Sequence, residues 1–429
     1  MTQNTAAAPA PLAPPVRRRL PTRTGLRVGG ATTLALIALL GLVTSVSAAT
    51  RQADLRHAVR TAEPLAVAAE DIYRDLSDAD AASAETFLSA AQAGTSGEER
   101  YDADVSRVSA NLAAVSADAR GSAQLRAADG ELLAGLPLFT KLIGTALADA
   151  RQNLPVGAAY LREASALLRD RLLPAAQQVL KVESDRLTAD GKDARSGSGL
   201  EFALIPLALA ALVVAQLFIR NRTRRQLNPG LLTASVLVLV IALWTLAAGS
   251  AERGAVAKAE MRWQAANAVI ATDLAAVQAH GDELLGLAAR GEDVGGYEKD
   301  FAAATARLDA LLANDHGASA DDARQARRSW AQAHLALLPA ENDPQPDNAA
   351  NIKALRLLTQ PVAGGSDAAF TRLDQDLRQS AGTEEAGYLA DVRTGHDDLA
   401  GLAIASAVLT AVALAAAAYG TDRRLREYR

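Results

Sequence analysis

The chain has 429 residues, of which 50% are hydrophobic and 22% charged, with a net charge of −5 and no cysteine. The lack of cysteine excludes disulfides and thiol-ligated metal sites. Many Ala and Arg with few Lys are typical of a high-GC, actinobacterial source.

The N-terminal 16 residues are rich in Ala, Pro, Thr and Gln, which cannot bury enough apolar surface to offset chain entropy. We therefore expect residues 1–30 to form a disordered basic tail. Four nearly uncharged stretches follow along the chain, each close to the roughly 20 apolar residues that a helix needs to cross a bilayer. They predict an integral membrane protein with four transmembrane helices, at 31–50, 200–219, 231–250 and 399–420.

Charge fixes the predicted topology. The segments between the first and second and between the third and fourth stretches are acidic, whereas every basic residue outside these two segments is an arginine next to a predicted span. These arginines form three clusters: Arg17, Arg18, Arg19, Arg23 and Arg27; Arg220, Arg222, Arg224 and Arg225; and Arg423, Arg424, Arg426 and Arg429. Because basic flanks stay on the cytoplasmic side, we expect a multi-pass protein of the plasma membrane with both termini cytoplasmic. The alternative is a cleaved signal peptide, since residues 45–48 (Ser-Val-Ser-Ala) resemble a cleavage site.

The predicted order is therefore a tail (1–30), a span (31–50), an extracytoplasmic bundle (51–199), a span (200–219), an Arg-rich turn (220–230), a span (231–250), a second extracytoplasmic bundle (251–398), a span (399–420) and a basic tail (421–429). The two outer segments look like an internal repeat. Residues 66–72 match 268–274, and Tyr101, Asp104 and Leu112 match Tyr297, Asp300 and Leu308 at identical spacing. Duplication is the interpretation we favour.

Both outer segments read as helical, being rich in Ala, Leu, Arg and Glu and poor in aromatic residues. Capping patterns mark helix starts at Ser96 and Ser319. Leucines at 173, 180 and 187, and the apolar residues 370, 373 and 377, predict buried helix faces. Breaks are expected at 93–97, near 120–121, at 152–155, 291–296, 316–319 and 339–349. They predict an all-α fold in which each segment is an up-down four-helix bundle whose outer helices continue into the membrane.

The sequence contains few patterns that indicate a catalytic or metal-binding site. Phosphate loops, metalloprotease and nucleophile-elbow motifs are absent. The five histidines, His57, His280, His316, His334 and His396, lack a recurrent metal spacing, and we expect each to be solvated or to cap a helix. Arg74 could bind a ligand carboxylate, but a solvated charge network with residues three or four positions away is the better interpretation. We therefore expect no enzyme activity, no cofactor or metal, and no nucleic-acid partner. Gly41 with Ser45, and Gly401 with Ala405, hint at close helix packing in the membrane.

Paired membrane helices extending into an outer helical bundle resemble the sensory half of chemoreceptors and sensor kinases, here duplicated and without an output half. In architecture, length and charge layout, residues 17–429 look like the GlnX-type membrane proteins of actinobacteria. That resemblance implies a relay from an extracytoplasmic solute-binding lipoprotein, which senses acidic amino acids, to a soluble serine/threonine kinase or its adaptor. The polar tip of the second segment, with Glu341, Asp343 and Asp347, would receive the binding protein, and the arginine clusters would contact the kinase. The alternatives are a sensor that binds a small ligand directly and a structural scaffold of the envelope; membrane lipid and a homo-oligomeric partner are further expectations.

Overall fold

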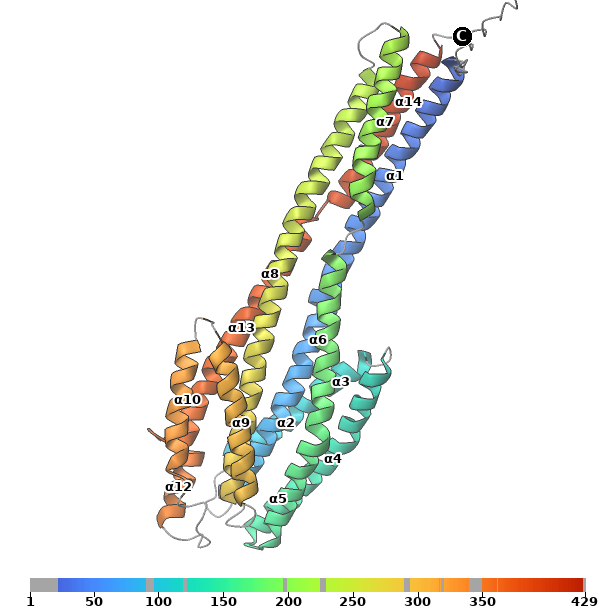
Figure 1. The fold of residues 1–429 in the computed structure, drawn as a ribbon. Helices are drawn as coiled ribbons and strands as arrows, with labels where there is room; N and C mark the ends of the chain where they lie inside the picture. The colour runs from blue at the N-terminus through green and yellow to red at the C-terminus, as the bar shows by residue number, and fades with distance from the viewer. Residues whose placement is uncertain are drawn as a thin grey trace, which may run out of the picture. The chain divides into compact units, whose positions relative to one another are not determined.

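The structure is a computed structural model that describes residues 22–89, 96–118, 122–195, 199–223, 229–288, 294–315, 317, 320–338, 349–360 and 362–426. Within these ranges the chain is helical and contains no strand, as the composition predicts (Figure 1). In chain order the elements are α1 (Thr22–His57), η1 (Ala58–Ala62), α2 (Glu63–Ser89), α3 (Ser96–Asp118), α4 (Ala123–Arg151), α5 (Val156–Leu167), η4 (Leu168–Leu172), α6 (Leu173–Arg195), α7 (Gly199–Thr223), α8 (Pro229–Ala288), α9 (Val294–Asn314), α10 (Ala320–Leu335), α12 (Ala349–Thr359), α13 (Ser366–Asp398) and α14 (Leu402–Arg426).

The helix ends fall at all six predicted breaks, because glycine, proline and short polar residues interrupt the helical pattern there. One expectation was wrong: the last helix of the second segment is not continuous, since α12 ends at Thr359 and α13 begins at Ser366. Gly364 between them has φ 80°, a left-handed conformation that favours glycine. A Cβ on Gly365 would lie 2.8 Å from the oxygen of Leu357, so the returning backbone requires glycine at this position as well.

The described chain divides into two compact units. We call Met1–Ala49, Ser198–Gly249 and Ala400–Arg429 the apolar unit, and Thr50–Gly197 and Ser250–Leu399 the charged unit.

In the apolar unit, α1, α7, the first part of α8 and α14 pack around a shared core. Its buried members include Ile37, Leu40, Leu204, Leu212, Val238 and Ala413. Helices α1 and α14 approach closely, since Ser45 Oγ lies 2.9 Å from Ser406 Oγ and a Cβ on Gly41 would collide with Thr410. Gly41 and Ser45 therefore mark a real helix contact, whereas Gly401 has φ 76° and lies before α14.

Among the residues that the structure describes, four helical stretches are long and apolar enough to cross a membrane: Arg27–Ser89, Ala123–Arg151, Pro229–Ala288 and Ser366–Arg423. Three of them contain predicted spans, but Ala123–Arg151 is α4 of the charged unit, and the predicted second span is the shorter apolar helix Ala203–Phe218 of α7. One face of α4, including Leu132, Phe139 and Ile143, is buried in the core of the charged unit. Helix α7 instead shares the apolar core with α1, α8 and α14.

The charged unit is built around α2 and α8 (Figure 1). Residues 79–88 of α2 and 279–288 of α8 are buried on every side. Helices α3, α4 and α6 pack on α2, and α13 packs on α10. The predicted apolar face at 370, 373 and 377 is buried, and at 173, 180 and 187 the first and last leucines are buried while Leu180 is partly buried.

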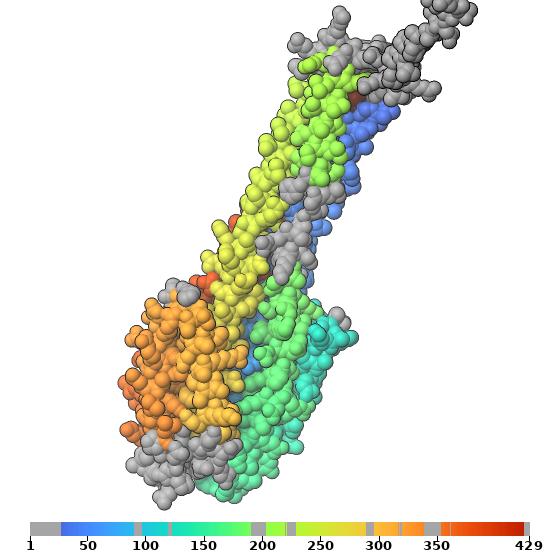
Figure 2. All heavy atoms as spheres, in the orientation of Figure 1, coloured from blue at the N-terminus to red at the C-terminus, as the bar shows by residue number. Residues whose placement is uncertain are grey.

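The second segment has an apolar core of its own, which includes Trp330 and Leu373, but the core of the first segment extends into the second. Leu284, Leu285 and Leu337 of the second segment belong to the same cluster as Leu76 and Phe139 of the first. Figure 2 shows the two segments packed without a gap on the visible face of this unit. That each segment is a four-helix bundle of its own stays a prediction.

Candidate functional site

The charged unit contains a seam of ion pairs between its two segments, in which each acid is largely buried and the arginine side chains range from 6% to 48% exposed. Four arginines reach across it. The pairs are Arg51–Glu252, Arg74–Asp273, Arg169–Asp282 and Arg378–Asp78. Burying charges in this way adds little stability compared with apolar packing, so the seam needs another explanation.

Arg74 shows how the local sequence was partly misread. Its guanidinium bonds Asp273 of α8, whose side chain is 2% exposed, and it lies close enough to Glu70 and Asp71 on its own helix to affect their pKa values. The charge network was expected, but Arg74 is not solvated, since its side chain is only 13% exposed. Its ion-pair partner comes from the other segment, 199 positions away, which helix spacing alone cannot reveal.

Arg169 lies in the π-helical turn η4, where one extra residue in the turn changes the direction of the side chains. Its guanidinium lies 2.7 Å from Asp282 Oδ1 and 3.3 Å from Asp300 Oδ2, and its carbon lies 5.4 Å from the ring centre of Tyr297. It also faces Asp80, which accepts a hydrogen bond of 2.6 Å from Ser165. The Arg169 guanidinium is thus close to acidic side chains of both segments.

Carboxyl groups in the seam have raised pKa values. Burial raises the pKa of Asp282 to about 7, with Arg169 opposing the shift and Asp300 and Asp80 adding to it. Within the first segment, burial also raises the pKa of Asp104, a neighbour of Asp78, to about 7. The pKa of Glu70 rises to about 8 through burial and then the nearby Glu385, against the charge of Arg74. The protonation of the seam therefore changes near neutral pH.

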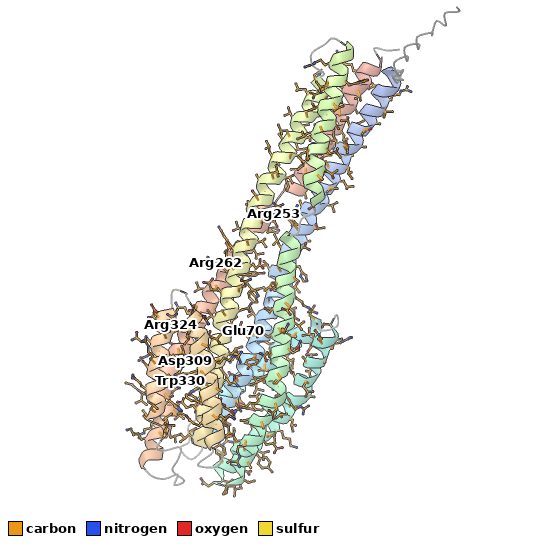
Figure 3. All side chains as sticks on the ribbon, viewed as in Figure 1. Glu70, Arg253, Arg262, Asp309, Arg324 and Trp330 are labelled. Carbon is orange, nitrogen blue, oxygen red and sulfur yellow. The ribbon has the colours of Figure 1, made fainter. Side chains whose placement is uncertain are left out.

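A second polar cluster lies inside the second segment and centres on Glu283, whose side chain is fully buried. Ser366 Oγ donates to its two oxygens at 2.7 and 2.6 Å, and Trp330 Nε1 donates at 3.1 Å. The Nδ1 atoms of His334 and His280 lie 2.9 and 3.4 Å from the carboxylate. We call these five residues, from α8, α10 and α13, the Glu283 cluster (Figure 3 labels Trp330 on α10).

Each imidazole of the Glu283 cluster stacks on an aromatic ring. The His280 ring stacks on Phe370 at 4.0 Å between centroids, and the His334 ring stacks on Phe301 at 3.9 Å. Burial alone would raise the pKa of Glu283, but hydrogen bonds and charge from the two histidines outweigh it and lower the pKa to about 2. Glu283 is therefore a permanent anion that ties together the helices of the second segment.

The expectation that every histidine is solvated or caps a helix was wrong for two of them. His280 and His334 are buried, at 4% and 5% exposure, because their partner carboxylate is buried with them. His57 is exposed, as expected. His396 is about a quarter exposed and accepts a hydrogen bond of 3.0 Å from Arg56, and His316 lies outside the described residues.

A cavity of about 700 Å³ opens in the second segment between α8, the end of α9 and α13. Four carboxylates line it, from Asp315, Asp322, Asp376 and Glu384. Glu384 is bound by Arg262 at 3.2 Å, and apolar residues such as Val269 and Leu311 form part of the wall. Its chemistry would suit a small cationic molecule with an apolar part.

Most of the site residues predicted from the sequence cannot be compared with the structure. The predicted tip residues Glu341, Asp343 and Asp347 lie outside the described residues, as do Arg17, Arg18, Arg19, Arg224 and Arg225. Arg222, Arg424 and Arg426 fall within α7 and α14, and Arg220 and Arg423 are exposed near the ends of these helices. In the described part of the chain, no three His, Asp or Glu side chains are placed to hold a metal ion.

Comparison with known proteins gives one match. Residues 54–192 match the model of a family described as the actinobacterial sensor domain. The matched range contains Arg74, Asp80 and Arg169 of the seam. Neither the curated proteins nor the solved structures contain a match to the chain. The match supports an actinobacterial sensor protein with a sensing role.

Proposed function

We propose that this chain is a membrane signal relay whose charged unit receives a stimulus outside the cell and whose four spans carry the response to a separate cytoplasmic protein. The sensor-domain match and the four apolar helices support a membrane sensor. The acidic segments and the arginine clusters beside the predicted spans support extracytoplasmic segments and cytoplasmic termini.

The buried seam is the observation that carries this proposal. Its ion pairs stabilise the contact between the two segments less than apolar side chains of the same area would. Several carboxyl groups in the seam would gain hydration if the segments moved apart. In this proposal the two segments have a second arrangement in which they lie farther apart. A stimulus that binds one arrangement more tightly shifts the population of chains toward it. The seam is therefore our proposed moving part.

An apolar seam tests that role. The double variant Arg74→Met/Asp273→Leu keeps the side-chain volume of the pair while removing its charge. We expect it to fold and insert as the wild type does, but to lose the stimulus-dependent change in phosphorylation of the cytoplasmic target in cells. The matched control is Lys181→Met/Asp185→Leu, which removes an exposed pair at 2.9 Å within the first segment. A normal response from the seam variant would show that the seam is only structural.

The chain's lack of cysteine makes the proposed topology directly testable. Lys141→Cys in α4 and Asp422→Cys at the end of α14 each place one thiol at an exposed position. We expect a membrane-impermeant maleimide to label position 141 in intact cells and position 422 only after permeabilisation. Labelling of position 422 in intact cells would overturn the orientation.

We further propose that the partners are an extracytoplasmic solute-binding lipoprotein, sensing acidic amino acids, and a soluble serine/threonine kinase or its adaptor. The triple variant Glu341→Ala/Asp343→Ala/Asp347→Ala should weaken capture of the binding protein without affecting insertion. A matched loss of charge at three exposed acids elsewhere, Asp309, Asp321 and Asp397, should leave capture unchanged. Equal capture by both triple variants would remove the tip from the proposal.

The acidic cavity favours one alternative, a sensor that binds a small cation directly. In that case the purified full chain alone would show a rise in melting temperature with a suitable amine, and Asp376→Asn with Asp322→Asn would abolish the rise. A relay that depends on a binding protein would show no such response in the purified chain.

A further inference from the structure

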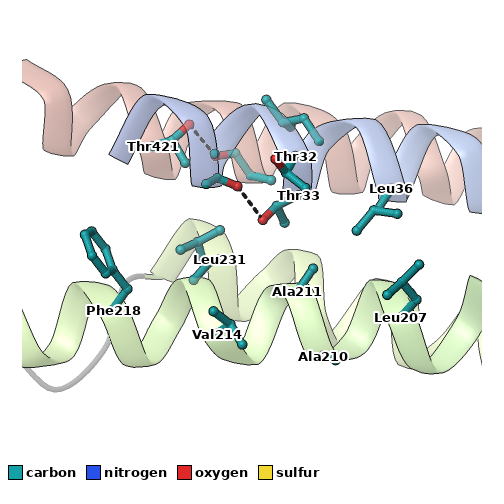
Figure 4. Close-up of a pocket in the computed structure, with 15 residues that line it drawn as sticks. Thr32, Thr33, Leu36, Leu207, Ala210, Ala211, Val214, Phe218, Leu231 and Thr421 are labelled. Atoms are coloured by element: carbon teal, nitrogen blue, oxygen red, sulfur yellow. Dashed lines mark hydrogen bonds between the residues drawn. The ribbon is translucent and has the colours of Figure 1, made fainter. Parts of the chain in front are cut away.

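A groove of about 470 Å³ lies within the apolar unit between α1 and α7 (Figure 4). Leu36 of α1 and Leu207, Val214 and Phe218 of α7 form its sides, and Leu231 of α8 lies at its base. Small residues keep the two helices from filling it, including Gly29 of α1 and Ala211 of α7.

The threonine hydroxyl groups in the walls of the groove already donate to backbone oxygens. Thr33 Oγ1 donates to the oxygen of Gly29 at 2.8 Å, and Thr421 Oγ1 donates to that of Ala417 at 3.0 Å, both within their own helices (Figure 4). Thr32 donates to Val28 in the same way at 2.9 Å. Because these hydroxyl protons are used and the rest of the lining is apolar, the groove favours the hydrocarbon part of a ligand.

The length of the groove matches one lipid leaflet. It follows α7 from Leu207 to Phe218, which at 1.5 Å per residue is about 16 Å. That is roughly half of the 30 Å hydrocarbon core of a bilayer. A single acyl chain fits this length, whereas a partner's transmembrane helix would need a groove along the whole span.

Positive charge gathers at one end of the groove. Arg27 precedes the lining residues of α1, Arg220 follows Phe218 by two positions, and Arg423 follows Thr421 by two; all three are exposed. A Cβ on Gly30 would lie 3.4 Å from Thr421 Cγ2, so α1 and α14 are neighbours at this end. Asp422 is the single acidic residue that the structure describes there.

We propose that the groove binds one acyl chain of an anionic phospholipid and that Arg27, Arg220 and Arg423 hold its phosphate. The bound lipid would connect α1, α7 and α14 at the end where the proposed relay delivers its signal. This inference rests on the proposed membrane placement but not on its orientation, because lipid binding can be measured when both faces are accessible.

The test uses the full chain, released from nanodiscs that contain equal amounts of phosphatidylglycerol and phosphatidylcholine, with retained lipid identified by native mass spectrometry. We expect one tightly retained phosphatidylglycerol per chain. Since each basic residue near anionic lipid contributes roughly fivefold in affinity, Arg27→Gln/Arg220→Gln/Arg423→Gln should lower the preference for the anionic lipid by about a hundredfold. The matched control is the same change at Arg126, Arg328 and Arg393, which are exposed in the charged unit.

A second variant tests the groove itself. Ala211→Phe should fill it and abolish retention of either lipid, whereas Val213→Phe, on an exposed position of α7 outside the lining, should not. Equal retention of the two lipids by the wild type, or an unchanged preference in the arginine variant, would overturn the proposal. So would a dimer that is lost with Ala211→Phe and carries no lipid, because the occupant would then be a second copy of the chain. A failed orientation test with intact lipid preference would refute only the proposed topology.

Discussion

Glu283→Gln replaces a buried anion by a neutral group of the same shape, and it tests whether the Glu283 cluster stabilises the charged unit. The carboxylate accepts hydrogen bonds from Ser366 and Trp330, and both histidines turn Nδ1 toward it. Glutamine offers one acceptor oxygen in place of two, and its NH₂ group would face these donors. At least one buried donor would therefore lose its partner.

The pKa of Glu283 gives the size of the effect. Its ordinary value is 4.5, and in the folded chain it is lowered to about 2, which corresponds to about 3 kcal/mol of stability above pH 4.5. Because the folded-state pKa is the lower one, this contribution is present above pH 4.5 and is lost as the pH falls toward 2. Removing one partner of a buried charge network typically costs 3–5 kcal/mol, which agrees.

Thermal unfolding of the full chain in nanodiscs, followed by tryptophan fluorescence, measures this prediction. For a unit of this size each kcal/mol lowers the melting temperature by roughly 2 °C, so Glu283→Gln should lower it by about 6 °C at pH 7. The matched control is Glu298→Gln, whose carboxyl is 42% exposed and 3.4 Å from His334. A shift below about 1 °C for Glu283→Gln, or equal shifts for both variants, would refute the assigned role.

Three further changes probe the rest of the charged unit. Glu70→Gln should nearly match the wild type in stability near pH 5 and exceed it by about 3–5 kcal/mol at pH 9. The folded-state pKa of about 8 lies above the ordinary 4.5, so the wild type loses stability as the pH rises from 4.5 to 8. Melting curves across pH measure this difference, and a constant difference would contradict it. Asp273→Asn should lower the free energy of unfolding by about 3–5 kcal/mol, measured by chemical denaturation, whereas Arg74→Met/Asp273→Leu should lower it far less. Similar losses for the two variants would mean that the pair is not buried as described. Gly157→Ala should destabilise the chain by about 1–3 kcal/mol, because its Cβ would lie 2.9 Å from a backbone oxygen of α4. Gly144→Ala has open space around it and should stabilise the chain by about 1 kcal/mol. The melting temperatures of the two variants should therefore move in opposite directions.

The sequence predicted the helices well and the site poorly, for different physical reasons. Helix ends are encoded locally, by residues such as Gly121 and Pro155, so all six expected breaks were recovered. The missed break at Gly364 had the same kind of signal. The Glu283 cluster had almost none, since Trp330, His334 and Ser366 lie 47, 51 and 83 positions from the glutamate.

One signal for the buried polar groups was present but was not used. Residues 279–288 place His280, Asp282 and Glu283 in a stretch that is otherwise apolar or glycine. Charges inside an apolar helical run indicate burial with partners, because an isolated buried charge is too costly. The identity of those partners still required the fold. The π-helical turn that positions Arg169 gives no comparable sequence pattern.

The shared core of the charged unit also bears on how the chain is made. Leu88 and Ala288 belong to one cluster, yet 200 residues of synthesis separate them, or about 10–40 s at bacterial rates. During that interval the first segment lacks Leu284, Leu285 and Leu337 of the second, and its apolar surface stays uncovered. The first segment can therefore complete its core only after residues 284–337 of the second have been made.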